Sequence, residues 1–574
     1  MLSWFDANPD RYWLFACICT VLPILIILRP ILRQRRAPSG SADWWWSLVI
    51  FFMLCAGRWP TWFVPRQFNE DESLLIAGAM TLRHDPVFFR AVDGGTAGPL
   101  DFYALLPIGW LHGADDFASA RFTAMVLVGL ALVFAHQSLS RLINSQTARV
   151  ATFGAVYMES FTLSPDLLHY STELVSVVLL SFALFAGIRR FSLKESIRWN
   201  IAGGLALGLV PFAKLQAAPI GLLLGVIWIV CEIRLSERSD RRVCITLAAL
   251  CGSALIPLTL CSVMLAVTGE WKNAVIPYIL HNLEYTNSVY IFAPGLTKLQ
   301  TLVALFQVAS TPGNLFAAWT VGSATWLLLA FAFARTPSKQ YQIVTLVVAV
   351  MLVVSTLCIL ATHRPFLHYA QLVVIPGTLL FGLAIGLSFF DNEKRPFHWH
   401  CGILCGTLLC SVGPSIYERA ENSFNYFGTL EALRTHPQGI VAAEISKYTT
   451  IGEPLAVWGW LSRCYVETGL RQATRNCASV HEIEPGKYRD YYRRRYLADL
   501  QSSFPPVFVD AVGSENFYFN DRSQAHDQSF PELADFVKLH YILVADVNTS
   551  RIFVRKDRLA SRLPTQNFSP QNAE

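Results

Sequence analysis

The chain has 574 residues, of which 53% are hydrophobic and only 15% are charged. Soluble globular proteins carry about 25% charged residues, so this composition excludes an ordinary cytosolic enzyme and predicts a polytopic membrane protein. The formal net charge of +5 is too small for a nucleic-acid-binding protein, and the 38 Phe, 19 Tyr and 16 Trp residues exclude a disordered chain.

A membrane-spanning helix needs roughly 20 mainly apolar residues. Segments of this kind predict a polytopic α-helical protein with about twelve transmembrane helices, at 12–28, 44–63, 118–138, 147–164, 171–188, 200–213, 215–233, 243–267, 314–334, 341–361, 367–390 and 398–414. The apolar stretch 298–311 is shorter and fits an interfacial helix or a half-span. No small-residue cleavage site follows the first span, so we expect it to be a retained helix.

Basic residues concentrate in alternate loops, and short loops rich in Lys and Arg face the cytoplasm. The segments 29–36 and 189–198 belong to this basic set. The opposite set contains the acidic loop 65–117 and the region from about residue 415 onward, which we therefore expect outside the membrane. Two domains follow from this, a transmembrane domain over 1–414 and an extracytoplasmic domain over 415–574.

The first external loop places three carboxylates, those of Glu70, Asp71 and Glu72, directly after a span. Like charges at this spacing repel one another and attract cations. A helix start explains Asn69 as the N-cap and Glu72 as its capping-box partner, but it leaves Asp71 without a task. An amphipathic segment, Ser73–Arg83, comes next and is expected to be a juxtamembrane helix.

The placement of Asp71 and Glu72 resembles the acidic motif in the first external loop of the GT-C superfamily of integral-membrane glycosyltransferases. The sequence looks most like glycosyltransferase family 39, with the protein mannosyltransferases and the lipid A aminoarabinose transferase. The stretch 93–103 has the Gly/Pro-rich approach and the aromatic exit of that family, but Thr96 and Ala97 replace the usual Glu-Lys.

Two later stretches, His363–Tyr369 and Val457–Gly469, also resemble segments of family 39-like proteins. The resemblance implies a GT-C-type bundle that takes a sugar from a polyprenyl-phosphate carrier and transfers it with inversion to an acceptor on the outer face. It also implies that Asp71 is the catalytic residue.

The chemistry of such a transfer gives the same residues roles. The acceptor hydroxyl must lose its proton as it attacks the anomeric carbon, so a general base is required, and we expect Asp71 to be that base. We expect Glu72 to be a second catalytic residue that positions substrate or tunes the charge of Asp71. We expect further substrate contacts from Glu70, Asp93 and Asp101 in the same loop.

A polar patch, Asp166–Glu173, precedes an otherwise apolar segment. His169 and Glu173 are four residues apart and share a face if they lie on one helix, where they could hold sugar hydroxyls or a cation. Tyr170 lies beside them and is a further candidate contact. The Ser-Thr pair within the patch suits a helix cap equally well, so both interpretations stay open.

Two basic groups near the outer membrane boundary are candidates for binding the donor phosphate, which needs cations or strong donors as negative charge develops. Lys214 lies between two prolines that interrupt an apolar run, and a cation at membrane depth is more often functional than not. A simple turn in water is the alternative. Arg364, with His363 and His368, forms the second group, for which a snorkelling arginine is the alternative. Tyr369, next to His368, is a further candidate for binding the donor phosphate.

The region after about residue 415 predicts a small α/β domain of about 150 residues. Its strand-like runs are Leu455–Trp460, Val507–Val512 and Tyr541–Val547. For Trp458, Trp460 and Tyr465 we favour core packing over stacking on sugar rings. The basic run Arg493–Arg495 is either a solvated face or a contact for acidic lipid headgroups.

Only two of the 13 cysteines, Cys464 and Cys477, lie in polar sequence. They form a disulfide if this region lies in an oxidising compartment, and the sequence leaves that open. No His/Asp/Glu cluster has the closed spacing of a structural zinc site. We therefore expect no metal site and no firm cofactor, with a divalent cation left open.

Together these features predict an inverting hexosyl- or pentosyltransferase of the bacterial inner membrane, with its active site and C-terminal domain facing the periplasm. The expected partners are a polyprenyl-phosphate-linked sugar, the lipid bilayer, and a glycan, lipid or protein acceptor, with no nucleic acid. One alternative is a flippase or transporter of lipid-linked sugars, which the crowding of polar groups at one face disfavours. The others are an oligosaccharide polymerase or ligase, and a receptor-like protein in which Asp71 is inert.

Overall fold

The computed structural model describes residues 9–32, 43–192, 196–235, 240–287, 296–311, 314–317, 319–324, 339–389 and 439–560. The chain divides into two compact units. The membrane unit comprises Met1–Glu72 and Gly95–Arg434, and the sheet unit comprises Ser73–Gly94 and Thr435–Glu574. Ser73–Gly94 therefore groups with the C-terminal residues, whereas the sequence analysis kept it in the first domain. The expected boundary at 414 lies outside the described residues and stays a prediction.

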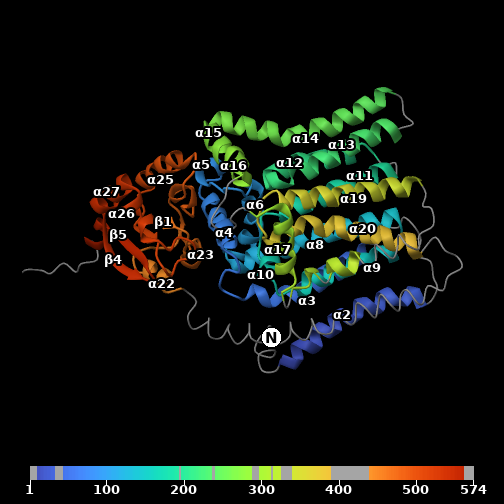
Figure 1. Cartoon of the computed structure of the whole chain (residues 1–574), viewed down its shortest axis with the longest axis horizontal. Coiled ribbons are helices and arrows are strands. Elements are labelled where there is room, and N and C mark those ends of the chain that lie inside the picture. The colour runs from blue at the N-terminus through green and yellow to red at the C-terminus, as the bar shows by residue number, and fades with distance from the viewer. Residues whose placement is uncertain are drawn as a thin grey trace, which may run out of the picture. The chain divides into compact units, whose positions relative to one another are not determined.

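Helices make up the described part of the membrane unit (Figure 1). The long ones are α2 (Pro9–Leu32), α3 (Trp44–Trp62), α8 (Phe117–Leu142), α9 (Ser145–Phe161), α11 (Leu174–Ser192), α12 (Arg198–Ala213), α13 (Ala218–Leu235), α14 (Asp240–Thr268), α17 (Lys298–Ala309), α19 (Lys339–Leu360) and α20 (Gln371–Phe389). Short helices connect them: α6 (Pro99–Tyr103), α7 (Leu106–His112), α10 (Pro165–Leu168), η1 (Leu215–Ala217), α15 (Trp271–Ala274), η2 (Val275–Leu280), α16 (His281–Asn287) and η3 (Leu367–Ala370).

Six helices in the described residues are long and apolar enough to cross a membrane, which confirms a polytopic membrane protein. They are Phe117–Leu142, Leu174–Phe191, Leu215–Arg234, Arg241–Thr268, Tyr341–Leu360 and Leu367–Gly386. The predicted total of twelve is not confirmed. The predicted spans near 44–63, 147–164 and 200–213 correspond to α3, α9 and α12. The predicted span 398–414 and much of 314–334 lie outside the described residues.

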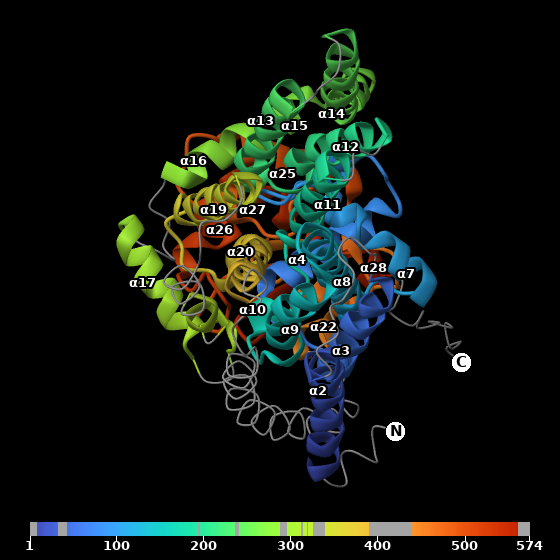
Figure 2. The ribbon, with the colours of Figure 1, turned by 90° about the vertical axis from the view of Figure 1, so that its right-hand side faces the viewer.

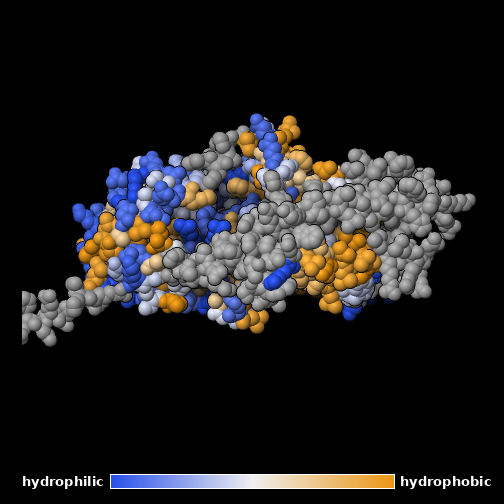
Figure 3. All heavy atoms as spheres, turned by 90° about the horizontal axis from the view of Figure 1, so that it is seen from below, coloured by the Kyte–Doolittle hydropathy of each residue, from blue (hydrophilic) through white to orange (hydrophobic). Residues whose placement is uncertain are grey.

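Helix α20 lies at the centre of the membrane unit, because 89% of the residues in its spanning window are buried. Figure 2 shows it end-on among α8, α9, α11 and α19, and each of these four helices contacts α20. Helix α14 is at the other extreme, with 22% of its window buried. A helix that is apolar all round and exposed at the surface faces lipid, and Figure 3 shows hydrophobic side chains on the surface of this unit.

Two glycines let α12 approach α14 closely. A Cβ atom on Gly208 would lie 2.1 Å from the carbonyl oxygen of Ala254, and one on Gly204 would lie 2.3 Å from that of Leu250. Small residues at such positions allow helix backbones to pack together inside a bilayer, where apolar side chains gain little from contact with one another.

The sheet unit contains a five-stranded sheet in the order β2-β1-β3-β5-β4. Its strands are β1 (Pro454–Gly459), β2 (Arg471–Gln472), β3 (Val507–Ala511), β4 (Tyr541–Val547) and β5 (Ser550–Arg555). Strand β1 runs parallel to β2 and β3, while β5 is antiparallel to β3 and β4. The helices α22 (Ile440–Ser446), α23 (Arg463–Thr468), α24 (Val480–Ile483), α25 (Arg489–Ser503), α26 (His526–Ser529) and α27 (Pro531–His540) accompany it. The predicted small α/β region is confirmed.

Both faces of the sheet are covered, since all residues of β3 are buried. Trp458 and Tyr465 are fully buried in two separate hydrophobic clusters, as expected for core packing. Ala77 from helix α4 (Glu70–Leu82) lies in the same cluster as Tyr465. The side-chain oxygen of Thr81 accepts a hydrogen bond of 3.0 Å from the backbone N–H of Gln472. These contacts explain why Ser73–Gly94 belongs to the sheet unit.

Candidate active site

The acidic motif forms the first turn of α4. The side-chain oxygen of Asn69 accepts a hydrogen bond of 3.0 Å from the backbone N–H of Asp71, so Asn69 caps the helix as expected. The carboxylate of Glu72 reaches past the cap and accepts a hydrogen bond of 3.0 Å from the backbone N–H of Phe68. Glu70 accepts a hydrogen bond from the side-chain amide of Gln67.

Glu72 is fully buried against Arg121 of α8. The Arg121 guanidinium donates to both carboxylate oxygens, at 2.8 and 2.9 Å, and also to the carbonyl oxygens of Thr61 and Val64. A bidentate pair of this kind is strong and fixes geometry. Because both oxygens of Glu72 are occupied, its role in the structure is to hold the start of α4, on which Asp71 lies.

Asp71 differs from its two neighbours. Its side chain is half-buried, and within the described part of the chain no hydrogen bond or ion pair engages its carboxylate. The lone pairs of this carboxylate are therefore available to accept a proton from another molecule. Helix capping does not use this carboxylate, because the cap contacts only the backbone N–H of Asp71.

Asp166 connects the acidic turn to the start of α20. One of its oxygens accepts a hydrogen bond of 3.0 Å from the side-chain amide of Asn69, and the other accepts one of 3.3 Å from the backbone N–H of Leu367. The Nδ1 atom of His368 lies 3.9 Å from the second oxygen. The His368 ring meets the His169 ring edge to face, with centroids 5.6 Å apart.

The expectation that His169 and Glu173 share a helix face is wrong. Helix α10 ends at His169, which has an extended backbone, and α11 begins only at Leu174. The Nδ1 atom of His169 lies 2.9 Å from the Pro165 carbonyl oxygen, which lets the ring close this short helix. The helix is therefore interrupted between His169 and Glu173, and the two side chains contact different partners.

Glu173 pairs with Lys214. The ammonium nitrogen lies 3.0 Å from a carboxylate oxygen of Glu173, and it also donates to the hydroxyl of Thr172. Both charged side chains are almost entirely buried, so the alternative of a lysine on a turn in water is wrong. Lys214 itself has an extended backbone between α12 and η1, which aims its side chain away from either helix axis.

Asp101 lies in the loop that packs against the end of α12. One carboxylate oxygen accepts a hydrogen bond of 3.2 Å from the backbone N–H of Gly98, and the other has no hydrogen-bond partner among the described residues. Burial raises the pKa of the Asp101 carboxyl well above its usual value, although Lys214 acts in the opposite direction. Burial thereby favours the protonated form of Asp101. The hydroxyl of Tyr170 donates to the Asp101 carbonyl oxygen, at 2.6 Å.

Gly98 is required where this loop meets α12. Its backbone N–H donates a hydrogen bond of 2.9 Å to the carbonyl oxygen of Ala213, the residue before Lys214. A Cβ atom at Gly98 would lie 2.2 Å from the carbonyl oxygen of Phe212. The Gly/Pro-rich sequence of this loop thus serves a close backbone approach beside Lys214.

Arg364 is buried beside two tyrosines. Its guanidinium carbon lies 3.4 Å from the centroid of the Tyr285 ring, and the Tyr285 hydroxyl oxygen lies 3.4 Å from that of Tyr369. The ammonium nitrogen of Lys214 is 5.5 Å from the centroid of the Tyr369 ring. The two predicted basic groups are thereby connected, and a snorkelling arginine is excluded for Arg364 by its 3% exposure.

One expected contact lies elsewhere. Asp93 belongs to the sheet unit and forms an ion pair with Arg495, whose side chain also donates to Asn476. Arg495 is buried, so the expected solvated or lipid-facing role does not apply to it. Asp93 thus has a structural partner within the sheet unit.

Several buried charged residues were not predicted from the sequence to form ion pairs. Arg121 and the buried pair of Arg58 with Glu159 lie within helices that are otherwise mainly apolar. Intramembrane charges are costly and usually paired, so their positions within spans were the available signal. Tyr285 carried no comparable signal, because an aromatic residue near a membrane boundary is common.

Two expectations concern metals and cysteines. In the described residues, Asp510, His526 and Asp527 lie close enough together to hold a metal ion. Arg551 pairs with both carboxylates and supplies the positive charge itself, and its hydrogen bonds help lower the pKa of Asp527 to about 2. Cys464 and Cys477 are both buried in the sheet unit, and the disulfide left open by the sequence stays a prediction.

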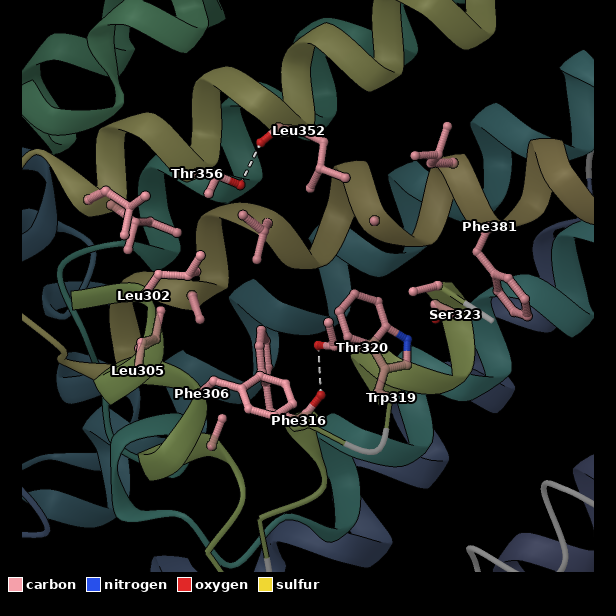
Figure 4. A pocket seen from close by; sticks show the side chains of 18 residues that line it. Leu302, Leu305, Phe306, Phe316, Trp319, Thr320, Ser323, Leu352, Thr356 and Phe381 are labelled. Atoms are coloured by element: carbon pink, nitrogen blue, oxygen red, sulfur yellow. Dashed lines mark hydrogen bonds between the residues drawn. The ribbon is translucent and has the colours of Figure 1, made fainter. Parts of the chain in front are cut away.

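An apolar cavity of about 290 Å³ lies between α17, α19 and α20. Figure 4 shows the rings of Phe306, Phe316 and Trp319 directed toward it. Its lining includes Leu360 and Ala370, which stand close in the chain to Arg364 and Tyr369. A hydrocarbon chain is the kind of ligand that such a lining suits.

No protein-family model and no curated protein matches the sequence. The structure is similar to that of ArnT from Cupriavidus metallidurans, solved with bound undecaprenyl phosphate, with a TM-score of 0.54 and 14% identity over 89% of this chain and 98% of that chain. The chain therefore has the GT-C fold. The resemblance found in the sequence is confirmed at the level of the fold.

A second similar structure is the archaeal oligosaccharyltransferase AglB from Archaeoglobus fulgidus, solved with an inhibitory peptide and a dolichol-phosphate. Its TM-score is 0.42, with 11% identity over 91% of this chain and 75% of that chain. This superposition is too loose to assign equivalent elements.

Proposed function

We propose that this protein is an inverting glycosyltransferase that moves a sugar from a polyprenyl-phosphate donor to an acceptor at the outer face of a bacterial inner membrane. The observation that carries the proposal is the presence of an unengaged carboxylate, two buried cations and an apolar cavity within one GT-C-type unit. These are the groups that such a transfer needs: a base, an anion site and a place for a lipid tail.

The donor phosphate is assigned to the cluster of Arg364, Lys214, His368 and Tyr369. A guanidinium and an ammonium stabilise the negative charge that grows on the phosphate as the glycosidic bond breaks, and a buried site makes that stabilisation larger than in water. The isoprenoid tail is assigned to the apolar cavity. ArnT, which shares the fold, was solved with undecaprenyl phosphate bound.

Asp71 is assigned as the general base. It removes the proton from the acceptor hydroxyl as the oxygen attacks the anomeric carbon from the side opposite the phosphate, which inverts the configuration there. Glu72, held by Arg121, positions Asp71 and does not contact substrate. Glu70 stays a candidate substrate contact.

The sugar contacts are assigned to the residues near Lys214. Asp101 offers a carboxyl oxygen and His169 a ring nitrogen, and neither atom has a hydrogen-bond partner among the described residues. Glu173 balances the charge of Lys214. Tyr170 supports the Asp101 loop through its hydroxyl, so we assign it to the scaffold, and Asp93 is left out of the site.

An oligosaccharide polymerase or ligase would use the same base and phosphate site and differ in the acceptor. A transporter needs neither an unengaged base nor cations confined to one end of the bundle. If the assay below detects no cleavage of the glycosidic bond, a transporter becomes the favoured function.

The test is turnover of a radiolabelled polyprenyl-phosphate sugar by purified full-length protein with membrane lipids as acceptors. Asp71→Asn keeps the size and shape of the side chain but removes the base, so we expect a loss of activity of roughly 10²–10⁴-fold. Asp490→Asn, an exposed position on α25, is the matched control and should behave like the wild type. Full turnover by Asp71→Asn would overturn the assignment.

A further inference from the structure

Tyr285 lies near the end of a segment that no sequence motif distinguished. The segment runs through α15, the π-helix η2 and α16, and so covers residues 271–287. π-helical turns are rare and often occur at functional sites, because they change the direction in which the following side chains point. The residues after this turn contact the cluster that holds the two cations.

One hydrogen bond joins this segment to the end of α12, just before Lys214, and another joins it to the loop at Gly95. The hydroxyl of Tyr278 donates a hydrogen bond of 2.6 Å to the carbonyl oxygen of Pro211, three residues before Lys214. The side-chain amide of Asn282 donates to the Tyr278 carbonyl oxygen at 2.6 Å and to the Gly95 carbonyl oxygen at 3.5 Å. Tyr285 is thus presented from an anchored helix.

The contact between Tyr285 and Arg364 is a stack of a phenol ring on a guanidinium, at 3.4 Å. Stacking uses the face of the guanidinium and leaves its N–H groups, which lie in the plane, directed at the edge. Those in-plane donors are the ones that bind phosphate oxygens two at a time. A ring fixed against the face therefore sets the direction in which Arg364 can bind an anion.

The hydroxyl of Tyr285 connects Arg364 to the second cation, Lys214, through Tyr369. It lies 3.4 Å from the hydroxyl of Tyr369, whose ring is in turn 5.5 Å from the ammonium of Lys214. The two phenols form a bridge from one cation to the other.

We propose that Tyr285 positions Arg364 for the phosphate of the lipid-linked donor and couples it, through Tyr369, to Lys214. The inference rests on the proposed function, because it names a determinant of that same phosphate site. Tyr285 acts through Arg364, so it is a positioning residue, and its loss should weaken donor binding far more than it slows the chemical step.

The experiment measures binding of undecaprenyl phosphate to purified full-length protein in detergent, which needs no knowledge of the sugar. Tyr285→Leu removes the stack and should raise the Kd roughly tenfold. Tyr285→Phe keeps the ring but loses the hydroxyl contact with Tyr369, so it should raise the Kd by about threefold, which is less than the effect of Tyr285→Leu. Tyr278→Phe removes the hydroxyl that holds the segment to Pro211 and leaves Tyr285 in place, so it measures the contribution of the anchoring alone, and its Kd should rise far less than that of Tyr285→Leu.

A second arm separates positioning from general loosening. Lysine has no planar guanidinium to stack, so in an Arg364→Lys background the change Tyr285→Leu should have no further effect on Kd. In turnover assays Tyr285→Leu should raise KM for the lipid-linked donor and leave kcat within about twofold.

The outcomes distinguish the two claims. If the wild type binds undecaprenyl phosphate and Tyr285→Leu binds it as tightly, the positioning role is overturned and the proposed function stands. If Tyr278→Phe weakens binding as much as Tyr285→Leu, the segment acts only as a scaffold and the inference is likewise overturned. If the wild type binds no polyprenyl phosphate, the proposed function fails and the inference fails with it.

Discussion

Glu72 and Arg121 illustrate how single residues support the candidate site. Their ion pair is fully buried, and the guanidinium also satisfies carbonyl oxygens at the end of α3 and in the loop that follows. A buried pair gains little over two apolar residues, but losing one partner leaves an uncompensated charge in a medium of low dielectric constant.

The first prediction concerns this pair. Arg121→Ala should lower the free energy of unfolding by about 3–5 kcal/mol, because it leaves Glu72 ionised, buried and alone. Thermal unfolding of the purified protein in detergent measures the effect. Adding Glu72→Gln should recover part of the loss, since the unpaired charge is then gone. An unchanged unfolding temperature in Arg121→Ala would contradict the role given to the pair.

A second prediction concerns pH and Glu482 in the sheet unit. Burial raises the pKa of this carboxyl from 4.5 to about 7, although Arg495 and Asn476 act against the rise. A folded-state pKa above the unfolded value means that the folded protein binds the proton more tightly. The contribution of Glu482 to the free energy of unfolding is therefore greatest below pH 4.5. It falls as the pH rises toward 7, by on the order of 3 kcal/mol in total.

Unfolding measured from pH 4.5 to 8 tests the effect of Glu482. Glu482→Gln carries no titrating proton, so its stability should change less across this range than that of the wild type. Glu515→Gln, at an exposed position, is the control and should follow the wild-type curve. Equal slopes for the wild type and Glu482→Gln would show that Glu482 does not titrate in this range.

At the scale of elements, the packing of α12 against α14 depends on glycines. Gly208→Ala should cost about 1–3 kcal/mol, because its Cβ would meet the backbone of Ala254 and the helices would have to separate. Gly252→Ala is the matched control on α14, since its Cβ would meet no atom within 4 Å. The control should be neutral or slightly stabilising, because alanine favours a helix over glycine. Equal unfolding temperatures for the two variants would rule out close packing at Gly208.

Elements defined by local pattern could be predicted from the sequence. The strands around Trp458 and Val509 follow from short runs of β-branched and aromatic residues, and six spans follow from length and hydropathy. The capping role of Asn69 could be predicted for the same reason, because a cap is a contact between neighbours in the chain.

Contacts between distant segments could not be predicted in this way. Thr81 pairs with Gln472 across almost the whole chain, and no periodicity in either segment reports the other. The break between His169 and Glu173 was missed because a spacing of four indicates a shared face only if the helix is continuous. Of the site, the residue types could be predicted, but not the Glu173–Lys214 pair or the stack on Tyr285.

At the scale of the whole molecule, the distribution of basic residues predicts which side each unit faces. A cysteine introduced at the exposed position Asp490 should react with a membrane-impermeant maleimide in intact spheroplasts. A cysteine introduced at Ser196, in a basic loop, should react only after the membrane is permeabilised. The wild-type protein measures the background from its native cysteines. Reaction of Ser196→Cys in intact spheroplasts would reverse the proposed orientation.

The sheet unit is assembled from two stretches, Ser73–Gly94 and Thr435–Glu574. During synthesis the first stretch leaves the ribosome long before the strands that cover Ala77 exist. Until translation nears its end, the early stretch carries apolar surface with no native cover, and it needs a chaperone or the bilayer to shield it. A fragment that begins near residue 435 would lack Ala77 and the rest of Ser73–Gly94 from its hydrophobic core. Neither this fragment nor the remaining part of the chain therefore contains the complete sheet unit.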